Sequence, residues 1–245
     1  MIEELQKRFR PILGEFLNSA PLTAVISHEL TVPEYRSILR QVFHHTRENP
    51  QLQAHATVRF RGRQRDLVKL FFKHAASEIG HDQLALNDFV TLGGDASMVP
   101  YENPLPATSA LLAFGFYQIN NLNPLGYLGY LYFLEAMPVQ SGGGLMDHLR
   151  EIGVPDSAMT FLRDHTEIDV GHTKLMEKYI VGLISDQKDF DCVEYAMKTT
   201  SYLYAQMMTQ AIETADQESR TGWNWEELDA DSETPPERRT LTAVS

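Results

Sequence analysis

Apolar residues recur every three or four positions along most of the chain, with charged residues between them. This spacing predicts amphipathic α-helices and no β-strand, since no stretch alternates with a period of two. The expected helices cover residues 2–18, 32–58 with a bend at Asn49-Pro50, 66–92, 107–137 with a break at 121–124, 145–152, 155–184 and 190–218, with a short segment at 21–29. The pattern therefore favours an all-α bundle of about seven helices.

Several residues mark the ends of these helices. Thr31 is expected to cap the helix that follows it, because a threonine hydroxyl accepts hydrogen bonds from the first turn. Gly93-Gly94 is a good helix end. The helix at 107–137 is apolar on nearly all sides, which predicts the central buried helix. We expect Pro138 to stop it and residues 141–144 to form a flexible turn.

The composition supports one folded domain with a different C-terminal segment. The chain has 245 residues, of which 43% are hydrophobic, enough for a sizeable core. We assign residues 1–218 to this domain. Residues 219–245 are rich in Glu, Asp, Thr, Pro and Arg, which predicts an acidic, loosely ordered tail. The formal charge of −12 argues against nucleic acid or an anionic membrane as a partner.

The chain carries no signal for export or membrane insertion. The single cysteine, Cys192, excludes an intrachain disulfide and fits a reducing compartment. The N-terminus lacks the apolar core of a signal peptide, and no run of eighteen apolar residues occurs. We therefore expect a soluble cytoplasmic protein. Pairing into a homodimer stays open.

One predicted helix carries metal-binding side chains at regular spacing: His165, three residues, Asp169, two residues, His172. Each residue of an α-helix turns by roughly 100°, so the three fall within about 40° of one another on one face. Imidazole and carboxylate together suit iron, manganese or zinc, and open positions at such a site suit non-haem iron. The alternative is a solvated polar face with scattered histidines.

Two further segments supply matching groups. Glu78 and His81 are spaced i and i+3 in the long third helix, which makes them neighbours on one face. Glu135 lies in an apolar stretch, where a carboxylate is costly unless it is paired or bound to a cation. The alternatives are a surface pair and a helix-end glutamate near Pro138 that reaches solvent. Helical bundles bury metals by pointing such groups inward. The three carboxylates and three histidines can hold two divalent irons and leave room for O2.

These motifs resemble those of a known family, the haem-oxygenase-like di-iron oxidases and oxygenases. The likeness rests on Glu-x2-His, a lone Glu at the end of an apolar helix and His-x3-Asp-x2-His, and it covers about residues 1–215. It extends to the helix start at Thr31 to Tyr35, the segment Tyr127 to Tyr130 and the aromatic last helix. The resemblance implies the seven-helix bundle shared with haem oxygenase, TenA and PqqC. It also implies two Fe(II) per chain, bound by Glu78, His81, Glu135, His165, Asp169 and His172.

The resemblance further implies an O2-dependent oxidoreductase. Its substrate would be a small organic molecule, a fatty acid or an amino acid derivative, undergoing decarboxylation, N-oxidation or C–C or C–N cleavage. The first alternative is a metal-independent TenA-like or PqqC-like enzyme of cofactor metabolism, in which Cys192 is the only available thiol nucleophile. Haem binding through one axial histidine and a ferritin-like iron store are further alternatives.

The remaining candidates concern the surroundings of the metal. Some relatives supply a carboxylate seven residues before the histidine of Glu-x2-His; here His74 stands there, and we interpret it as a core or surface histidine in preference to a ligand. Candidates for an apolar pocket, or for plain core, are Phe114, Phe116, Tyr117, Tyr130, Phe133, Tyr202 and Met207. Basic candidates for binding a substrate carboxylate are Arg163, Lys174 and Lys198.

Overall fold

The computed structural model describes residues 1–60 and 65–221, without the side chains of residues 167–170, 173 and 216–221. These residues form nine α-helices, three short 3-10 helices and no strand. The α-helices are α1 (Ile2–Leu17), α2 (Ala20–Ile26), α3 (Val32–Arg59), α4 (Arg65–Ser77), α5 (His81–Thr91), α6 (Pro106–Asn121), α7 (Tyr127–Glu151), α8 (Thr160–Leu183) and α9 (Gln187–Thr221). The all-α prediction is confirmed.

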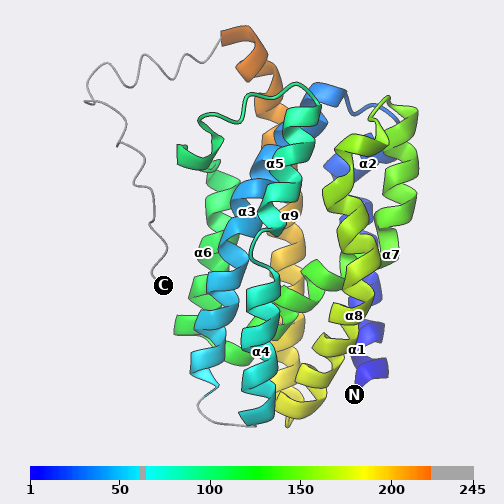
Figure 1. The fold of residues 1–245 in the computed structure, drawn as a ribbon. Coiled ribbons are helices and arrows are strands. Elements are labelled where there is room, and N and C mark those ends of the chain that lie inside the picture. The colour runs from blue at the N-terminus through cyan, green and yellow to red at the C-terminus, as the bar shows by residue number, and fades with distance from the viewer. Residues whose placement is uncertain (61–64, 222–245) are drawn as a thin grey trace, which may run out of the picture.

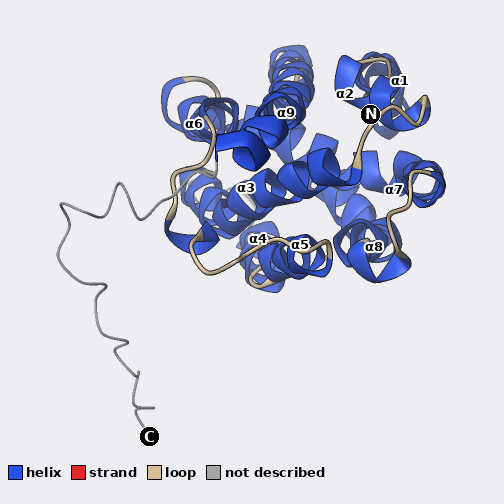
Figure 2. Cartoon of the chain, turned by 90° about the horizontal axis from the view of Figure 1, so that it is seen from above, coloured by secondary structure: helices blue, strands red, loops and turns tan. Residues whose placement is uncertain are grey.

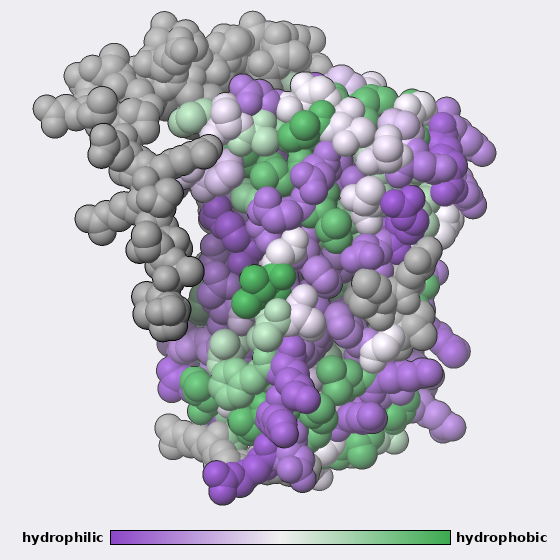
Figure 3. Space-filling view, in the orientation of Figure 1, coloured by the Kyte–Doolittle hydropathy of each residue, from purple (hydrophilic) through white to green (hydrophobic). Residues whose placement is uncertain are grey.

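The helices surround α3, which crosses the middle of the bundle when it is viewed from above (Figure 2). It packs against α4, α5, α6 and α9, whereas α7 runs beside α8 and contacts α9. The apolar stripe predicted on α1 is buried in the core: Leu5, Phe9, Ile12 and Phe16. On the face drawn in Figure 3, hydrophobic and hydrophilic residues are interspersed.

The helix expected at 66–92 is divided in two. Gly80 has φ +105°, a backbone conformation that glycine adopts without steric cost. Therefore α4 ends at Ser77, α5 begins at His81, and Glu78 lies in the turn between them. The expectation that Glu78 and His81 share one helix was wrong, although their side chains still meet.

The expectation that Pro138 stops a helix was also wrong, because α7 continues through it to Glu151. The glycines after Pro138 are helical as well. A Cβ on Gly142 would lie 2.1 Å from the Thr166 hydroxyl oxygen, so glycine lets α7 approach α8 closely there. A Cβ on Gly129 would likewise lie 2.0 Å from the backbone oxygen of Val193 on α9. These glycines serve helix packing. The predicted break between α6 and α7 is confirmed.

Two caps fix the starts of α3, at the centre of the bundle, and of α8, which carries His165 and His172. The predicted cap at Thr31 is confirmed: the Glu34 N–H donates to its hydroxyl at 3.4 Å, and the Thr31 N–H donates to the Glu34 carboxylate at 2.6 Å. The residue before α8 provides no side-chain cap. Instead, Asp88 of α5 accepts hydrogen bonds from the backbone N–H groups of Thr160 and Phe161. Asp88 thereby ties the start of α8 to α5.

None of the described helices combines the length and the hydropathy of a membrane-spanning segment. Residues 222–245, most of the predicted tail, lie outside the described part of the chain, as do residues 61–64 between the helices expected at 32–58 and 66–92. The division into a domain at 1–218 and a tail at 219–245 therefore stays a prediction.

Candidate metal centre

Four side chains from three helices and one turn converge inside the bundle: His74 of α4, Glu78, Glu135 of α7 and His172 of α8. Each offers one donor atom, and these atoms lie within 4.8 Å of one another. His74 Nε2 is 3.1 Å from Glu135 Oε1 and 3.5 Å from Glu78 Oε1. His172 Nδ1 is 3.2 Å from Glu135 Oε2 and 3.4 Å from Glu78 Oε1. Two imidazoles thus face two buried carboxylates.

Glu78 also belongs to a second group, with His81 and His165, whose donor atoms again lie within 4.8 Å of one another. His81 Nδ1 is 3.2 Å from Glu78 Oε2. His165 Nδ1 lies 2.8 Å from the backbone oxygen of Phe161. An Nδ1–H donated to that oxygen leaves the Nε2 lone pair of His165 available as a ligand. Glu78 is therefore shared by two groups, each sized for one ion.

The structure brings together five of the six residues predicted from the sequence: Glu78, His81, Glu135, His165 and His172. The sixth, Asp169, belongs to α8, and its side chain lies outside the described residues. Glu135 is 6% exposed and faces the other donors, so it is not a helix-end glutamate that reaches solvent.

His74 is the residue that the sequence interpretation placed second to a plain core or surface role. It is 2% exposed and directs Nε2 at the two glutamates. Its spacing offered a signal, because His74 precedes Glu78 by four residues and a helix brings such residues together. The contact with Glu135 depends on α7 and is not visible in the sequence.

The glutamates and histidines of the cluster shift one another's pKa values toward the charged forms. Burial raises the pKa of Glu78, but contacts with His74 and His81 outweigh it and hold the pKa far below its ordinary value. Burial raises the pKa of Glu135, but the hydrogen bond with His172 and the nearby His74 ring, 3.1 Å from the carboxylate, outweigh it and lower the pKa. Burial opposes protonation of His74, yet the two glutamates raise its pKa. The carboxylates are ionised, so the cluster attracts cations.

The donor set fits a pair of divalent ions. His74 Nε2 and Glu78 Oε1 are buried, and neither meets a hydrogen-bond partner of good geometry among the described residues despite their short separations. Buried polar atoms normally find such partners. Atoms that converge without bonding one another are the expected arrangement around a cation. Mixed imidazole and carboxylate donors suit iron, manganese or zinc.

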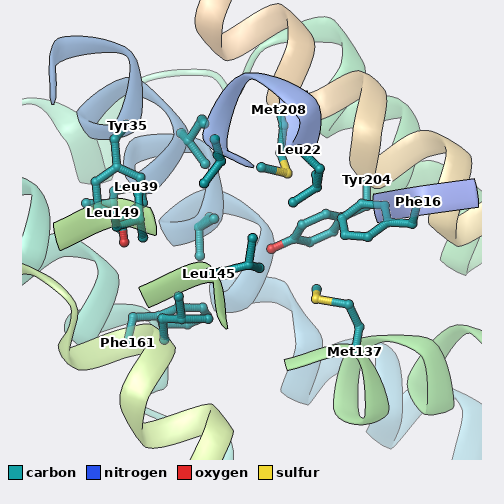
Figure 4. A pocket seen from close by; sticks show the side chains of 14 residues that line it. Phe16, Leu22, Tyr35, Leu39, Met137, Leu145, Leu149, Phe161, Tyr204 and Met208 are labelled. Atoms are coloured by element: carbon teal, nitrogen blue, oxygen red, sulfur yellow. The ribbon is translucent and has the colours of Figure 1, made fainter. Parts of the chain in front are cut away.

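Two adjoining cavities lead away from the cluster. The nearer one is lined by Glu78, Glu135 and His165 together with polar groups of α3, including His45 and Gln53. The farther one is almost wholly apolar, and Figure 4 shows Phe16, Leu22, Leu39, Leu145, Leu149 and Met208 around it. Both cavities share four residues: Met137, Phe161, Leu162 and Tyr204. The space is polar at the donors and apolar beyond them.

The other sequence candidates lie elsewhere. None of the aromatic and methionine candidates lines either cavity; Tyr117 and Tyr202 are exposed, and Tyr130, Phe133 and Met207 are buried core. Arg163, Lys174 and Lys198 are absent from both linings as well. Cys192 lines neither cavity, and burial raises the pKa of its thiol.

Comparison with known proteins relates this geometry to a family. A family model described as "iron-containing redox enzyme" matches residues 36–211. No match was found among curated proteins. A domain of unknown function with a heme oxygenase-like fold from Shewanella denitrificans OS217 superposes with a TM-score of 0.82 at 23% identity, covering 91% of this chain and 97% of that one.

Two TenA homologues share the fold at lower identity. The protein from P. horikoshii OT3 gives a TM-score of 0.70 at 13% identity, covering 86% of this chain and 98% of its own. The protein from Pseudomonas syringae pv. tomato str. DC3000 gives 0.71 at 12% identity, covering 86% and 92%. The predicted haem-oxygenase-like fold is thereby confirmed.

Proposed function

Since the chain belongs to the family of iron-containing redox enzymes, we propose that it is a non-haem di-iron oxidoreductase that uses O2 to oxidise a small organic substrate. The observation that carries the proposal is the position of Glu78 in two donor groups at once. A carboxylate has two oxygens and can bridge two cations. A glutamate shared by two donor groups therefore supports a two-ion centre over a single-ion site.

The donor groups divide between the two ions. Glu135 and His172 would hold one ion, His81 and His165 the other, and Glu78 both. Asp169 stands between His165 and His172 along α8, and we assign it the third carboxylate. Reduced iron at such a centre supplies the activation of O2. Ferrous iron and a single cysteine suit a reducing compartment, so we place the enzyme in the cytoplasm.

The surrounding chain binds and orients the substrate. An apolar tail would occupy the farther cavity beside Leu39, Leu145 and Leu149, with the reactive head at the donors. Packing the tail there also excludes water from the ions, which limits side reactions. This division favours a fatty acid or another molecule with an apolar tail over a free amino acid.

A metal-independent TenA-like enzyme is the second candidate, and the thiol disfavours it. The TenA likeness, at 12–13% identity, concerns the fold alone. A nucleophilic cysteine needs a lowered pKa, since the thiolate is the reactive form. Burial instead raises the pKa of Cys192.

The proposal is tested by loading the apoprotein with Fe(II) without oxygen, then measuring O2 uptake with fatty acids of graded length and with amino acids. We expect uptake that depends on one substrate class and is abolished in His172→Ala. Leu145→Trp fills the apolar cavity, so it should suppress substrate-dependent uptake while iron content stays unchanged. Val181→Trp, on the exposed face of α8, is the control. Full activity in His172→Ala, or activity in the iron-free protein, would contradict the proposal.

A further inference from the structure

We propose that His74 is a ligand of one of the two ions, and that this neutral donor leaves the centre with excess positive charge, which binds the anionic head of the substrate. The inference rests on the proposed function and deepens it. His74 joins the donor set, and the substrate group that binds at the metal is negatively charged.

The position of His74 supports its assignment as a metal ligand. Its side chain is completely shielded from solvent, and its ring centroid is 4.3 Å from that of His172. Its Nε2 belongs to the same group of converging atoms as Glu78, Glu135 and His172. Without His74 this group would hold one imidazole and two carboxylates; with it, the ion gains a fourth protein ligand.

A histidine that only fills the core would look different. The Nε2–H of such a residue would point at an acceptor, whereas His74 Nε2 forms no hydrogen bond of good geometry among the described residues. It is nevertheless within 3.5 Å of two carboxylate oxygens. The nitrogen is aimed at the space between the donors, where an ion would be.

Gln53 of α3 holds the ring in this orientation. The amide nitrogen Nε2 of Gln53 is placed 2.9 Å from His74 Nδ1, and both side chains are buried. An amide rotated by half a turn presents its oxygen to Nδ1–H, and the nitrogen and oxygen of such a group are nearly indistinguishable by shape. A ligating histidine is commonly fixed by a hydrogen bond from its other ring nitrogen. Gln53 supplies this contact.

The charges of the donors support the second claim, that the centre binds an anionic head. Glu78 and Glu135, together with Asp169 in the role proposed for it above, would bring three negative charges against four positive charges on two ferrous ions. His74 adds a donor without adding charge. The residues that line the two cavities, as far as the structure describes them, include no lysine or arginine. Burial lowers the pKa of His45 to about 4, so it is neutral at physiological pH. An anionic head therefore finds positive charge only at the ions.

The experiment compares the wild-type apoprotein with His74→Ala, His74→Glu and the control His45→Gln. His45 is a buried histidine beside the same cavity that lies outside the donor groups. Each protein is titrated with Co(II), whose visible absorption reports coordination, and then with azide as a small anion. Circular dichroism checks folding. Wild type and His45→Gln should bind two Co(II); His74→Ala should bind one of them at least tenfold more weakly.

His74→Glu separates coordination from charge. It keeps a ligand but balances the fourth positive charge, so it should bind two Co(II) and bind azide at least tenfold more weakly than wild type. Unchanged Co(II) affinity and absorption in His74→Ala would overturn the ligand role. Unchanged azide affinity in His74→Glu would overturn the charge argument. Both results leave the proposed function standing, whereas a wild-type protein that binds no metal would refute it.

Discussion

The first turn of α8, the helix that carries His165 and His172, depends on a side chain from another helix. The buried carboxylate of Asp88 accepts hydrogen bonds from the Thr160 N–H at 3.0 Å, the Thr160 hydroxyl at 2.6 Å and the Phe161 N–H at 2.8 Å. Asp88→Ala leaves two backbone donors without an acceptor, each of which costs about 1–3 kcal/mol.

The loss is smaller than the sum of three charge-assisted bonds. Burial raises the pKa of Asp88 by more than its hydrogen bonds lower it, so the wild-type carboxylate already carries a desolvation cost. We therefore expect Asp88→Ala to lower the free energy of unfolding by about 2–4 kcal/mol.

Urea denaturation followed by circular dichroism measures this loss. The control is Asn87→Ala, an exposed neighbour on α5, which should stay within about 0.5 kcal/mol of wild type. The dependence of the free energy on urea concentration should be unchanged in both variants, since neither changes the surface exposed on unfolding. If Asp88→Ala were as stable as Asn87→Ala, the capping contact would not hold α8 in place.

Other parts of the bundle give further expectations. Gly129→Ala should destabilise the protein by about 1–3 kcal/mol or more, because the added Cβ would meet the backbone of α9. Gly143→Ala should stabilise it by about 0.5–1 kcal/mol, because a Cβ there has no atom within 4 Å and alanine favours the helix. Thermal unfolding of the two variants and the wild type compares these effects. Burial raises the pKa of Glu102, but Arg40 and His44 outweigh it and lower the pKa. The ionised Glu102 carboxylate therefore contributes to the free energy of unfolding above about pH 4.3, and this contribution is lost as the pH falls further. Glu102→Gln should flatten this acid dependence, measured by urea unfolding at several pH values. Iron affinity, followed by titration, should decline below about pH 6.5, where protons compete for the imidazoles, and unchanged binding at pH 5 would exclude these ligands.

Features that depend on residues close together in the sequence were predictable, among them the apolar face of a helix and the cap at its start. The stripe of α1 was predictable because helical spacing alone decides which face is apolar. The cap at Thr31 needs only Glu34, three residues later. Glu135 stood out because a carboxylate in an apolar helix needs a partner.

Features set by contact between distant segments were not predictable. The helix continues past Pro138, and Gly142 further along it lies against Thr166 on α8, a contact that the sequence does not display. An isolated glycine such as Gly80 fits either a helix or a break. His74 was ranked too low because its partners Gln53 and Glu135 belong to other helices.

The most direct test of the two-ion centre is the stoichiometry of Fe(II) binding to the apoprotein, titrated without oxygen and quantified by elemental analysis after removal of free metal. Two irons per chain, with no haem absorbance, is the predicted result. Retention of no iron, or saturation at a single iron per chain, would contradict it.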